Sequence, residues 1–370
     1  MKLAFLSNWD SPHFQRWALE LDRRGHDVHV ITQHYESPRK GTVNLYRLPF
    51  KGLAGYFLNL PFARKIVFRI KPDLIHAHYA TGYGLLGKFS SWKPFLISVY
   101  GDDVYNVPER SRFHRNLVCN NLRGADRICS TSQNMINRIM QLEPDLQNTC
   151  VIPFGIDTTK FSPKLTARTD DFITIGVVKL LLPNAGIDIL LKAVRKVIDE
   201  LERSNERSAD QLRLLIVGSG PELSNLVALA KVLGLWHITE FAPQVPHEII
   251  PAYFQRMDIY CALSREESFG VAALEASACE IPVIASREKG LLENHVDGVT
   301  ALFVNKDEVS AAAKSLIRLI LDPSLRSRLG RNGRKHVITN FEWNKCVNMM
   351  ESVYNTVLNN KGMSVPVNRN

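Results

Sequence analysis

Short apolar runs alternate with amphipathic segments along the chain. In the first half, runs rich in β-branched residues predict strands, and apolar residues three or four positions apart predict helices. We expect strands at residues 2–7, 26–32, 73–79, 95–101, 126–132 and 150–155, and helices at 13–25, 82–91 and 112–125. Since most of these helices lie between two strands, the pattern indicates a parallel sheet covered by helices on both faces.

The same alternation starts again in the second half. Strands are expected at 172–178, 212–218, 238–243, 259–264, 281–286 and 301–304, and helices at 187–202, 222–234, 249–256, 271–279, 309–321 and 341–358. The polar segment 156–170 contains Pro163 and lacks periodicity, which predicts a linker. Because 370 residues exceed what one core usually organises, we expect two domains, 1–165 and 166–345, and then a helix and disordered tail in 346–370.

Composition indicates an ordinary soluble globular protein, with 45% hydrophobic and 22% charged residues. No stretch approaches the ~20 consecutive apolar residues of a membrane span. The N-terminal apolar run is broken by Ser7, Asn8 and Asp10, which favours a first strand over a signal peptide. The cysteines form no CxxC pair or Cys/His array, so we expect a reduced, cytoplasmic protein without structural zinc. They are Cys119, Cys129, Cys150, Cys261, Cys279 and Cys346.

The excess positive charge lies entirely in the first half. Residues 1–165 hold 22 Lys and Arg against 13 Asp and Glu, whereas residues 166–370 hold 24 of each kind. A one-sided positive field is typical of a protein that faces an anionic partner. The sequence has no zinc finger, RRM-type aromatic pair or KH loop, so we expect no nucleic-acid partner. An anionic membrane or an anionic acceptor remains.

One segment of this basic half, residues 51–71, combines apolar and basic side chains. Such a stretch either lies in a lipid interface or packs on the sheet with its charges in water, and Pro61 is expected to interrupt its helix. Its apolar members are Phe57, Leu58, Leu60, Phe62, Ile66, Val67, Phe68 and Ile70, and its basic members are Lys51, Arg64, Lys65, Arg69 and Lys71.

The turn between the predicted strand ending at Leu263 and the helix starting at Val271 carries the clearest chemistry. Gly270 relaxes the backbone there, and the free N–H groups and dipole of the helix start form an anion site suited to a diphosphate. Glu267 precedes the helix and Glu275 lies inside it. Both carboxylates would repel phosphate unless each faces a hydroxyl, which a nucleotide sugar offers on its ribose and its hexose.

Three motifs in sequence order extend this interpretation. They are VIPFGIDTTKF at 151–161, LLIVGSGPEL at 214–223 and ESFGVAALEASACEIPVIAS at 267–286. With the spacing of the two glutamates, they make the chain resemble the family-4 retaining glycosyltransferases over nearly its whole length. The resemblance implies an α/β chain with the GT-B fold, in which two Rossmann-like domains face each other across a donor and acceptor crevice.

The resemblance also implies roles for individual residues. Glu267 would hold a hexose hydroxyl near the reacting carbon, and Lys179 would neutralise the leaving phosphate, although Lys179 could also be a solvated strand-end lysine. Glu293 matches a further acid of the family or is a surface carboxylate. In this resemblance, the donor-binding residues would be Glu275 at the ribose, together with Ser268, Phe269, Gly270, Val271, Leu274 and Gly218.

The chain departs from the family pattern at several positions. Asn184 and Ala185 replace a second lysine, Tyr100 stands where many relatives have a histidine, and Glu280 and Lys289 replace glycines. The residues expected to face the acceptor or the other domain are His13, Arg16, Tyr100, Gly101 and Asp103. Two other polar pairs favour structural roles over metal binding, because neither has a further ligand at metal spacing: they are His76 with His78 and Asp102 with Asp103.

The function expected from the resemblance is transfer of a hexose from a nucleotide sugar to an acceptor hydroxyl with retention of anomeric configuration. No metal or cofactor other than the nucleotide sugar is expected. The acceptor would be a glycan or a lipid-linked sugar of surface glycan or glycolipid assembly, reached from the cytoplasm or the inner face of the membrane. Two alternatives stay open: a nucleotide-sugar 2-epimerase or hydrolase, and a non-catalytic nucleotide-sugar-binding partner. The nucleotide, the sugar and the linkage are not predicted.

Overall fold

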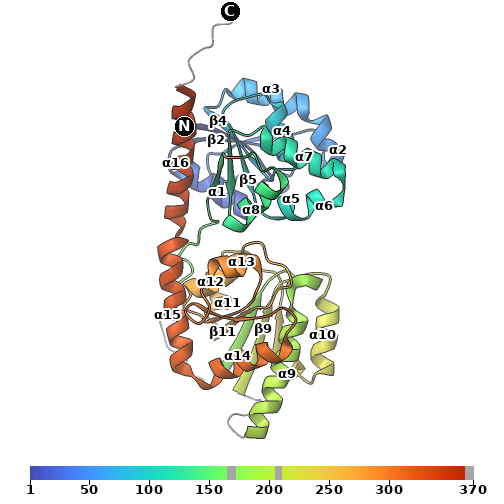
Figure 1. Cartoon of the computed structure of the whole chain (residues 1–370), viewed down its shortest axis with the longest axis vertical. Helices are drawn as coiled ribbons and strands as arrows, with labels where there is room; N and C mark the ends of the chain where they lie inside the picture. The colour runs from blue at the N-terminus through green and yellow to red at the C-terminus, as the bar shows by residue number, and fades with distance from the viewer. Residues whose placement is uncertain (165–171, 205–210, 363–370) are drawn as a thin grey trace, which may run out of the picture. The chain divides into compact units, whose positions relative to one another are not determined.

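The computed structural model describes residues 1–164, 172–204 and 211–362, with side chains up to residue 360. The chain divides into two compact units (Figure 1). Met1–Phe154 and the residues from Cys346 onward form the first unit, and Gly155–Lys345 form the second. The first unit therefore ends earlier than the predicted 165 and includes most of the last helix. Residues 363–370, where a disordered tail was expected, lie outside the described part.

The first unit is built on a parallel sheet with strand order β3-β2-β1-β4-β5-β6-β7. The order reverses between β1 and β4, which is the place where open α/β sheets bind ligands. Four central strands are buried almost throughout, as expected for a sheet covered on both faces. The strands are β1 (Lys2–Leu6), β2 (Asp27–Thr32), β3 (Asn44–Arg47), β4 (Leu74–His78), β5 (Phe95–Val99), β6 (Arg127–Ser130) and β7 (Thr149–Val151).

Serine caps start three helices of this unit, because the side chains of Ser11, Ser111 and Ser132 accept hydrogen bonds from backbone N–H groups in the first turn. Pro61 lies in the first turn of α3, so the predicted interruption of the 51–71 helix is confirmed. The helices are α1 (Pro12–Arg23), α2 (Gly52–Leu58), α3 (Leu60–Ile70), α4 (Gly82–Phe89), α5 (Asp102–Tyr105), α6 (Val107–Arg110), α7 (Arg112–Arg123) and α8 (Gln133–Leu142).

The second unit contains a parallel sheet of order β10-β9-β8-β11-β12-β13, which reverses between β8 and β11. Its strands are β8 (Ile173–Val178), β9 (Leu212–Val217), β10 (Thr239–Ala242), β11 (Ile259–Ala262), β12 (Val283–Ser286) and β13 (Ala301–Val304). Its helices are η1 (Pro183–Ala185), α9 (Ile187–Ser204), α10 (Leu223–Val232), η3 (Trp236–Ile238), α11 (Ile250–Phe254), α12 (Val271–Ala278), α13 (Lys289–Asn294), α14 (Val309–Leu321) and α15 (Pro323–Asn340).

The described part of the predicted linker, residues 156–164, contains no helix and no strand beyond an isolated bridge at Ile156, but it packs on the second unit. Ile156 and Phe161 are fully buried in the second unit, and Arg334 donates to the carbonyls of Thr158 and Phe161. Two isolated apolar anchors in a polar sequence show no periodicity, so the pattern could not reveal that this segment packs. Residues 165–170 lie outside the described ranges.

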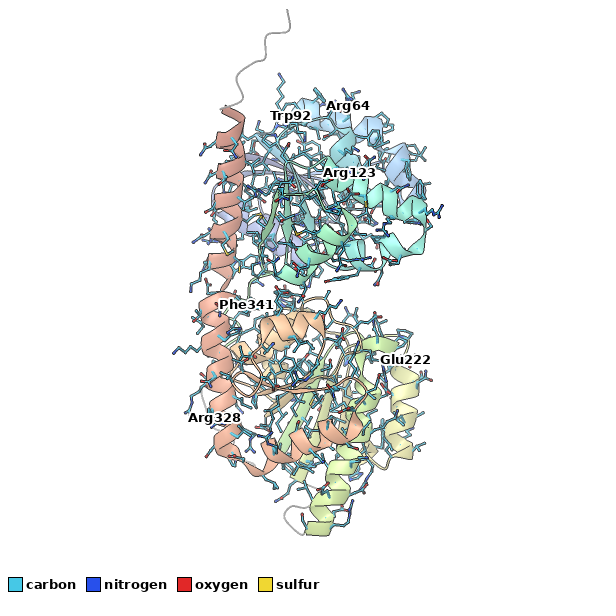
Figure 2. All side chains as sticks on the ribbon, viewed as in Figure 1. Arg64, Trp92, Arg123, Glu222, Arg328 and Phe341 are labelled. Carbon is cyan, nitrogen blue, oxygen red and sulfur yellow. The ribbon has the colours of Figure 1, made fainter. Side chains whose placement is uncertain are left out.

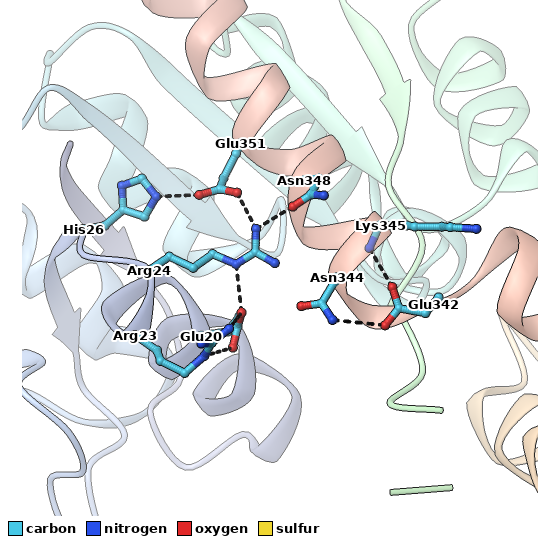
Figure 3. A network of polar contacts seen from close by, with 9 residues as sticks. All are labelled: Glu20, Arg23, Arg24, His26, Glu342, Asn344, Lys345, Asn348 and Glu351. Atoms are coloured by element: carbon cyan, nitrogen blue, oxygen red, sulfur yellow. Dashed lines mark hydrogen bonds and ion pairs between the residues drawn. The ribbon is translucent and has the colours of Figure 1, made fainter. Parts of the chain in front are cut away.

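The last helix, α16 (Trp343–Gly362), joins the first unit from Cys346 onward through a polar network (Figure 3). The Glu351 carboxylate accepts a hydrogen bond of 2.6 Å from Arg24 and lies 2.8 Å from Nε2 of His26. Arg24 also donates to Glu20 at 2.8 Å. Further along α16, the Tyr354 hydroxyl lies 2.9 Å from Nδ1 of His76 on β4. These contacts fix the helix to the sheet that the first half of the chain builds.

Glu351→Gln should lower the free energy of unfolding by about 1–2 kcal/mol at pH 7, because it removes a partly buried charge from the network. Burial raises the pKa of Glu351, but hydrogen bonds from His26 and Arg24 outweigh it and hold the pKa below its usual range. The stabilisation is therefore present above the unfolded pKa of about 4.3 and is lost as the pH falls through the lower folded value.

Urea unfolding of wild type and Glu351→Gln between pH 7 and pH 3 measures this effect, and the difference between them should shrink on acidification. Glu200→Gln, at an exposed position on α9, is the control and should match wild type. A difference between Glu351→Gln and wild type that stays constant down to pH 3 would contradict the assignment.

Candidate active site

The predicted catalytic residues meet where the strand order of the second unit reverses. Lys179 follows β8, Ser264 and Glu267 follow β11, and these two strands are neighbours. The Lys179 ammonium donates to Oε2 of Glu267 and to Oγ of Ser264, both at 2.6 Å. The two charged side chains are 23% and 21% exposed, so a ligand can reach a pair that protein otherwise surrounds.

Helix α13 holds the loop that carries Glu267 through two hydrogen bonds. The Gly290 N–H donates to the Glu267 carbonyl at 3.1 Å, and the Asn294 side-chain amide donates to the Phe269 carbonyl. A Cβ atom on Gly290 would lie 2.5 Å from the Phe269 nitrogen, so only glycine allows this approach. Gly270, at φ +87°, then turns the chain into α12. Such support holds the loop in one geometry before any ligand arrives.

The start of helix α12 is where the anion site is predicted, and the structure corrects one residue of that prediction. The Leu274 side chain is fully buried, and its N–H donates to the Gly270 carbonyl at 3.3 Å. Leu274 therefore has no donor left for a diphosphate. The first N–H groups of a helix have no partner within it, and here they belong to Val271 and Ala272. Ser268, just before Phe269, is half-buried at the same helix start.

Glu275 is paired with a residue that sequence analysis did not predict. Its buried carboxylate lies 2.7 Å from Nε2 of His247, which follows β10. The centroid of the His247 ring lies 5.4 Å from that of the Phe161 ring. His247 sits in an irregular segment, where a lone histidine carries no signal of its spatial partner. Both predicted carboxylates thus have a Lys or His partner within hydrogen-bond distance in the same unit.

The turn after β9 borders the same edge through a close backbone contact. Gly218 has φ +147°, and a Cβ atom there would lie 1.9 Å from the Lys179 carbonyl oxygen. Asn184, one of the departures from the family pattern, lies in the neighbouring loop. Its backbone carbonyl accepts a hydrogen bond of 2.9 Å from the backbone N–H of Arg265. The Arg265 guanidinium also binds Asp188 through two contacts of 2.9 Å. Arg265 was missed because only the fold brings residue 188 beside it.

In the first unit, Asp103 and Gly101 shape the turn after β5. The buried Asp103 carboxylate accepts from the N–H groups of Ala80, Tyr100 and Gly101 at 2.9–3.1 Å. Burial raises the pKa of Asp103, and these hydrogen bonds oppose the rise. Gly101, at φ +128°, begins α5. Asp103 therefore holds the turn in place and has little capacity left for a ligand.

Tyr100 replaces the histidine of the family pattern but contacts another one. Its hydroxyl lies 2.6 Å from Nδ1 of His78, whose pKa burial holds well below its usual range, so His78 is neutral. The Tyr100 ring lies 5.3 Å from that of Phe154, which lies 5.0 Å from the exposed His13 ring. Arg16 is half-buried one turn further along α1. The structure thus groups His13 and Tyr100 around Phe154.

The remaining polar candidates have structural roles. His76 lies between Tyr354 and Ser98, and burial lowers its pKa to about 3. Asp102 pairs with Arg110 at 3.6 Å. Within the described ranges, no three His, Cys, Asp or Glu side chains are close enough to hold a metal ion.

The structure also shows the surroundings of Glu280, Lys289 and Glu293, which sequence analysis singled out. Glu280 has φ +61°, a left-handed conformation that glycine adopts without strain, which is consistent with the glycine expected there from the family pattern. Lys289 is exposed at the start of α13, and Glu293 is half-buried near the end of that helix.

Two family models match the chain and divide it as the two sheets do. The model described as "Glycosyl transferases group 1" matches residues 157–336, and "Glycosyl transferase 4-like" matches residues 2–132. The first match contains Lys179, Glu267 and Glu275, and the second contains His13 and Tyr100.

Individual proteins agree with these matches. The D-inositol 3-phosphate glycosyltransferase of Acidothermus cellulolyticus is 31% identical over 77% of this chain and 67% of its own. Sucrose-phosphate synthase from Thermosynechococcus elongatus is similar in structure, with a TM-score of 0.82 and 22% identity over 97% of this chain and 100% of its own. Anabaena HepE in complex with UDP and glucose is also similar in structure, with a TM-score of 0.78 and 19% identity over 96% of this chain and 100% of its own. The predicted α/β fold class, GT-B, is confirmed, and the chain belongs to the glycosyl transferases group 1 family.

Proposed function

We propose that the protein transfers a hexose from a nucleotide sugar to an acceptor hydroxyl with retention of anomeric configuration. The observation that carries this proposal is the Lys179–Glu267 pair at the switch point of the second sheet. Glu267 lies in the strand-to-helix connection that leads into α12. A cation and free helix N–H groups suit the diphosphate, while two carboxylates suit the ribose and hexose hydroxyls. The UDP and glucose bound by the structural neighbour HepE support a nucleotide-sugar donor.

In this mechanism the donor diphosphate lies at the start of α12, beside Val271 and Ala272. Glu275 accepts from the ribose hydroxyls, and Glu267 accepts from a hexose hydroxyl. As the bond between the sugar and phosphate breaks, charge grows on the leaving oxygen, which Lys179 and the helix dipole stabilise. The acceptor attacks from the same face and gives its proton to the departing phosphate, which retains the anomeric configuration. No metal ion is required in this scheme.

Transfer assays with UDP-, GDP-, ADP- and dTDP-sugars, preceded by a thermal-shift screen, test the function. A ligand at ~100 times its dissociation constant adds about 2.7 kcal/mol of stability. NMR of the product reports the anomeric configuration, and activity should survive EDTA. Donor turnover without acceptor would favour the epimerase or hydrolase, and binding without turnover would favour the non-catalytic partner. Inversion of configuration would refute the mechanism.

Glu275→Gln should weaken donor binding by about tenfold or more, because a charged acceptor of two ribose hydroxyls becomes a neutral amide. His247→Ala should weaken it less, since it removes the group that orients Glu275 and leaves the carboxylate in place. Donor dissociation constants from calorimetry measure both effects. His237→Ala is the control, because this exposed histidine lies on η3, outside the site. Equal affinity in wild type and Glu275→Gln would reject the ribose assignment.

We also propose that the acceptor is lipid-linked and that α2 and α3 contact an anionic membrane at the cytoplasmic face. Of α2, only Gly55 is buried, while Leu53 is 86% exposed. Helix α3 buries Ala63, Val67 and Ile70 in the core, so its other faces remain available, and Figure 2 marks Arg64 on this helix. The exposed apolar side chains of this surface are Phe50, Leu53, Phe57, Leu58, Phe62 and Phe68.

Charge supports a membrane as the partner of this surface. Residues 51–71 contain five Lys and Arg and no Asp or Glu. Basic side chains close to anionic headgroups contribute about 1 kcal/mol each, and exposed aromatic and leucine side chains add apolar burial in the interface. No helix of the described residues is long and apolar enough to cross a bilayer. Attachment would therefore be peripheral.

Replacing Arg64, Lys65, Arg69 and Lys71 by glutamine should reduce binding to phosphatidylserine-containing vesicles by about 100-fold or more at low salt. Vesicle sedimentation measures the partition coefficient, and wild-type binding should fade as salt rises. Four exposed basic residues of the second unit provide a matched control with the same charge change, and glutamine there should have little effect: Lys314, Arg318, Arg328 and Arg331. Equal loss in both variants would show a net-charge effect without a docking surface.

A further inference from the structure

Cys129 and Cys150 are direct partners across two neighbouring strands. Cys129 lies on β6 and Cys150 on β7, and the register of the parallel pair places them opposite each other. Their sulfur atoms are 3.7 Å apart. Neighbouring strands lie about 4.8 Å apart, within the Cα separation that a disulfide spans. Neither residue belongs to the proposed transfer chemistry.

The strand that carries Cys150 can move toward its partner. β7 is the edge strand of the sheet, and among the strands that the structure describes it pairs with β6 alone. Closing the gap to the ~2.05 Å of a disulfide needs a rotation of the side chains and a small shift of β7. Cys129 also lines a cavity of about 10 Å³, room for roughly one water molecule, so its side chain is not held by tight packing on every side.

The two thiols differ in the way that stepwise thiol exchange requires. Cys129 is buried, whereas Cys150 is half-buried and is the more accessible of the two. The hydrogen bond with Cys129 lowers the pKa of Cys150, and the charge of Arg127 adds to this against the effect of burial. The same hydrogen bond and burial raise the pKa of Cys129. Cys150 is therefore the attacking thiolate, and Cys129 is the resolving thiol.

We propose that Cys129 and Cys150 form a reversible redox-modification site that takes a low-molecular-weight disulfide as its oxidant. The Cys150 thiolate attacks one sulfur of that disulfide, forms a mixed disulfide and releases one small thiolate, which takes up a proton. Cys129 then loses its proton and attacks the sulfur of Cys150, which expels the second small thiol. Two protein thiols are oxidised to one disulfide, and the small disulfide is reduced to two thiols.

The consequence reaches the cluster around Phe154. Pro153 and Phe154 follow β7 almost directly, and the Phe154 ring contacts both Tyr100 and His13. A shift of β7 toward β6 therefore moves the backbone that positions this ring. Transient disulfides of this kind in reduced compartments are mostly catalytic or redox-sensing. Oxidation would therefore change the positions of the residues expected to face the acceptor, in response to the thiol and disulfide levels around the protein.

Oxidised glutathione and the full-length reduced protein provide the test. All six cysteines are free in the structure, so alkylation after denaturation should count six thiols before oxidation and four after it. Trypsin cuts after Arg127, Arg138 and Lys160, which places the two cysteines in separate peptides. Without reduction, the peptides 128–138 and 139–160 should appear joined, and dithiothreitol should separate them. This readout does not depend on transferase activity, so it stays valid if the proposed function fails.

Two variants complete the experiment. Cys150→Ser should abolish the joined peptide, and its five thiols should all remain free after treatment with the oxidant. Cys119→Ser also has five thiols, and it should still lose two of them to the disulfide. A joined peptide in wild type supports the site without any variant, which covers the case in which the Cys150→Ser substitution prevents folding. Three results would overturn the proposal: all six thiols stay free, Cys150 carries glutathione without closing on Cys129, or either cysteine joins a different one.

Discussion

Lys179→Ala should lower kcat by about 100-fold or more, the cost of removing one preorganised charge stabiliser from a transition state. Lys179 is held at 2.6 Å from both Ser264 and Glu267, so its ammonium is fixed before the donor binds. Charge on the leaving phosphate is larger in the transition state than in the bound donor. The loss should therefore fall on kcat more than on donor affinity. Steady-state kinetics with a saturating acceptor measures it.

A lysine elsewhere in the same unit separates this effect from a general change of charge. Lys196 is exposed on α9 and donates to Ser310 at 2.8 Å. Lys196→Ala should keep kcat within a factor of about two of wild type, as expected for a surface substitution. If Lys179→Ala also stayed within that range, Lys179 would be the solvated strand-end lysine that sequence analysis left open. Circular dichroism of both variants checks that the fold is retained.

The repeated strand and helix pattern was sufficient to predict the fold class, because parallel strands buried on both faces read as continuous apolar runs. Twelve of the described strands match a predicted run within a few residues, and β3 is the exception. NLYR is four residues long at the sheet edge and partly exposed, so neither length nor burial marks it. Helix α15 was missed because its arginine-rich sequence hides a narrow buried stripe that includes two glycines.

The candidate site was predictable where it lies within one strand-to-helix connection. Glu267, Gly270 and Glu275 are close in sequence, and the turn chemistry constrains them together. His247 and Arg265 were not predicted as site residues, because their partners are distant in sequence and only the sheet order brings them near. Leu274 shows the opposite limit: its position in a motif says nothing about whether its N–H is already used within the helix.

Gly218 links the stability of the second unit to the position of Lys179. A Cβ atom there would lie 1.9 Å from the Lys179 carbonyl oxygen, which is backbone and cannot swing away as a side chain would. The Lys179 N–H is also bonded to the Val217 carbonyl at 3.0 Å, so the two turns form one unit of structure. Any extra atom at position 218 must push the turn after β8 outward, and Lys179 must move with it.

Gly218→Ala should therefore lower the free energy of unfolding by about 3 kcal/mol or more, because the clash adds to the cost of a left-handed backbone. It should also lower kcat at temperatures where the variant is folded, since the ammonium of Lys179 moves away from Glu267.

Gly298→Ala is the matched control in the same unit: its φ is +70°, but nothing lies within 4 Å of the added Cβ atom. It should show only the backbone strain, about 1–2 kcal/mol, and wild-type kcat. Thermal unfolding and kinetics of the two variants measure both effects. Equal stability and equal kcat in the two variants would refute the argument, because the backbone clash would then carry no cost and Lys179 would not depend on the turn after β9.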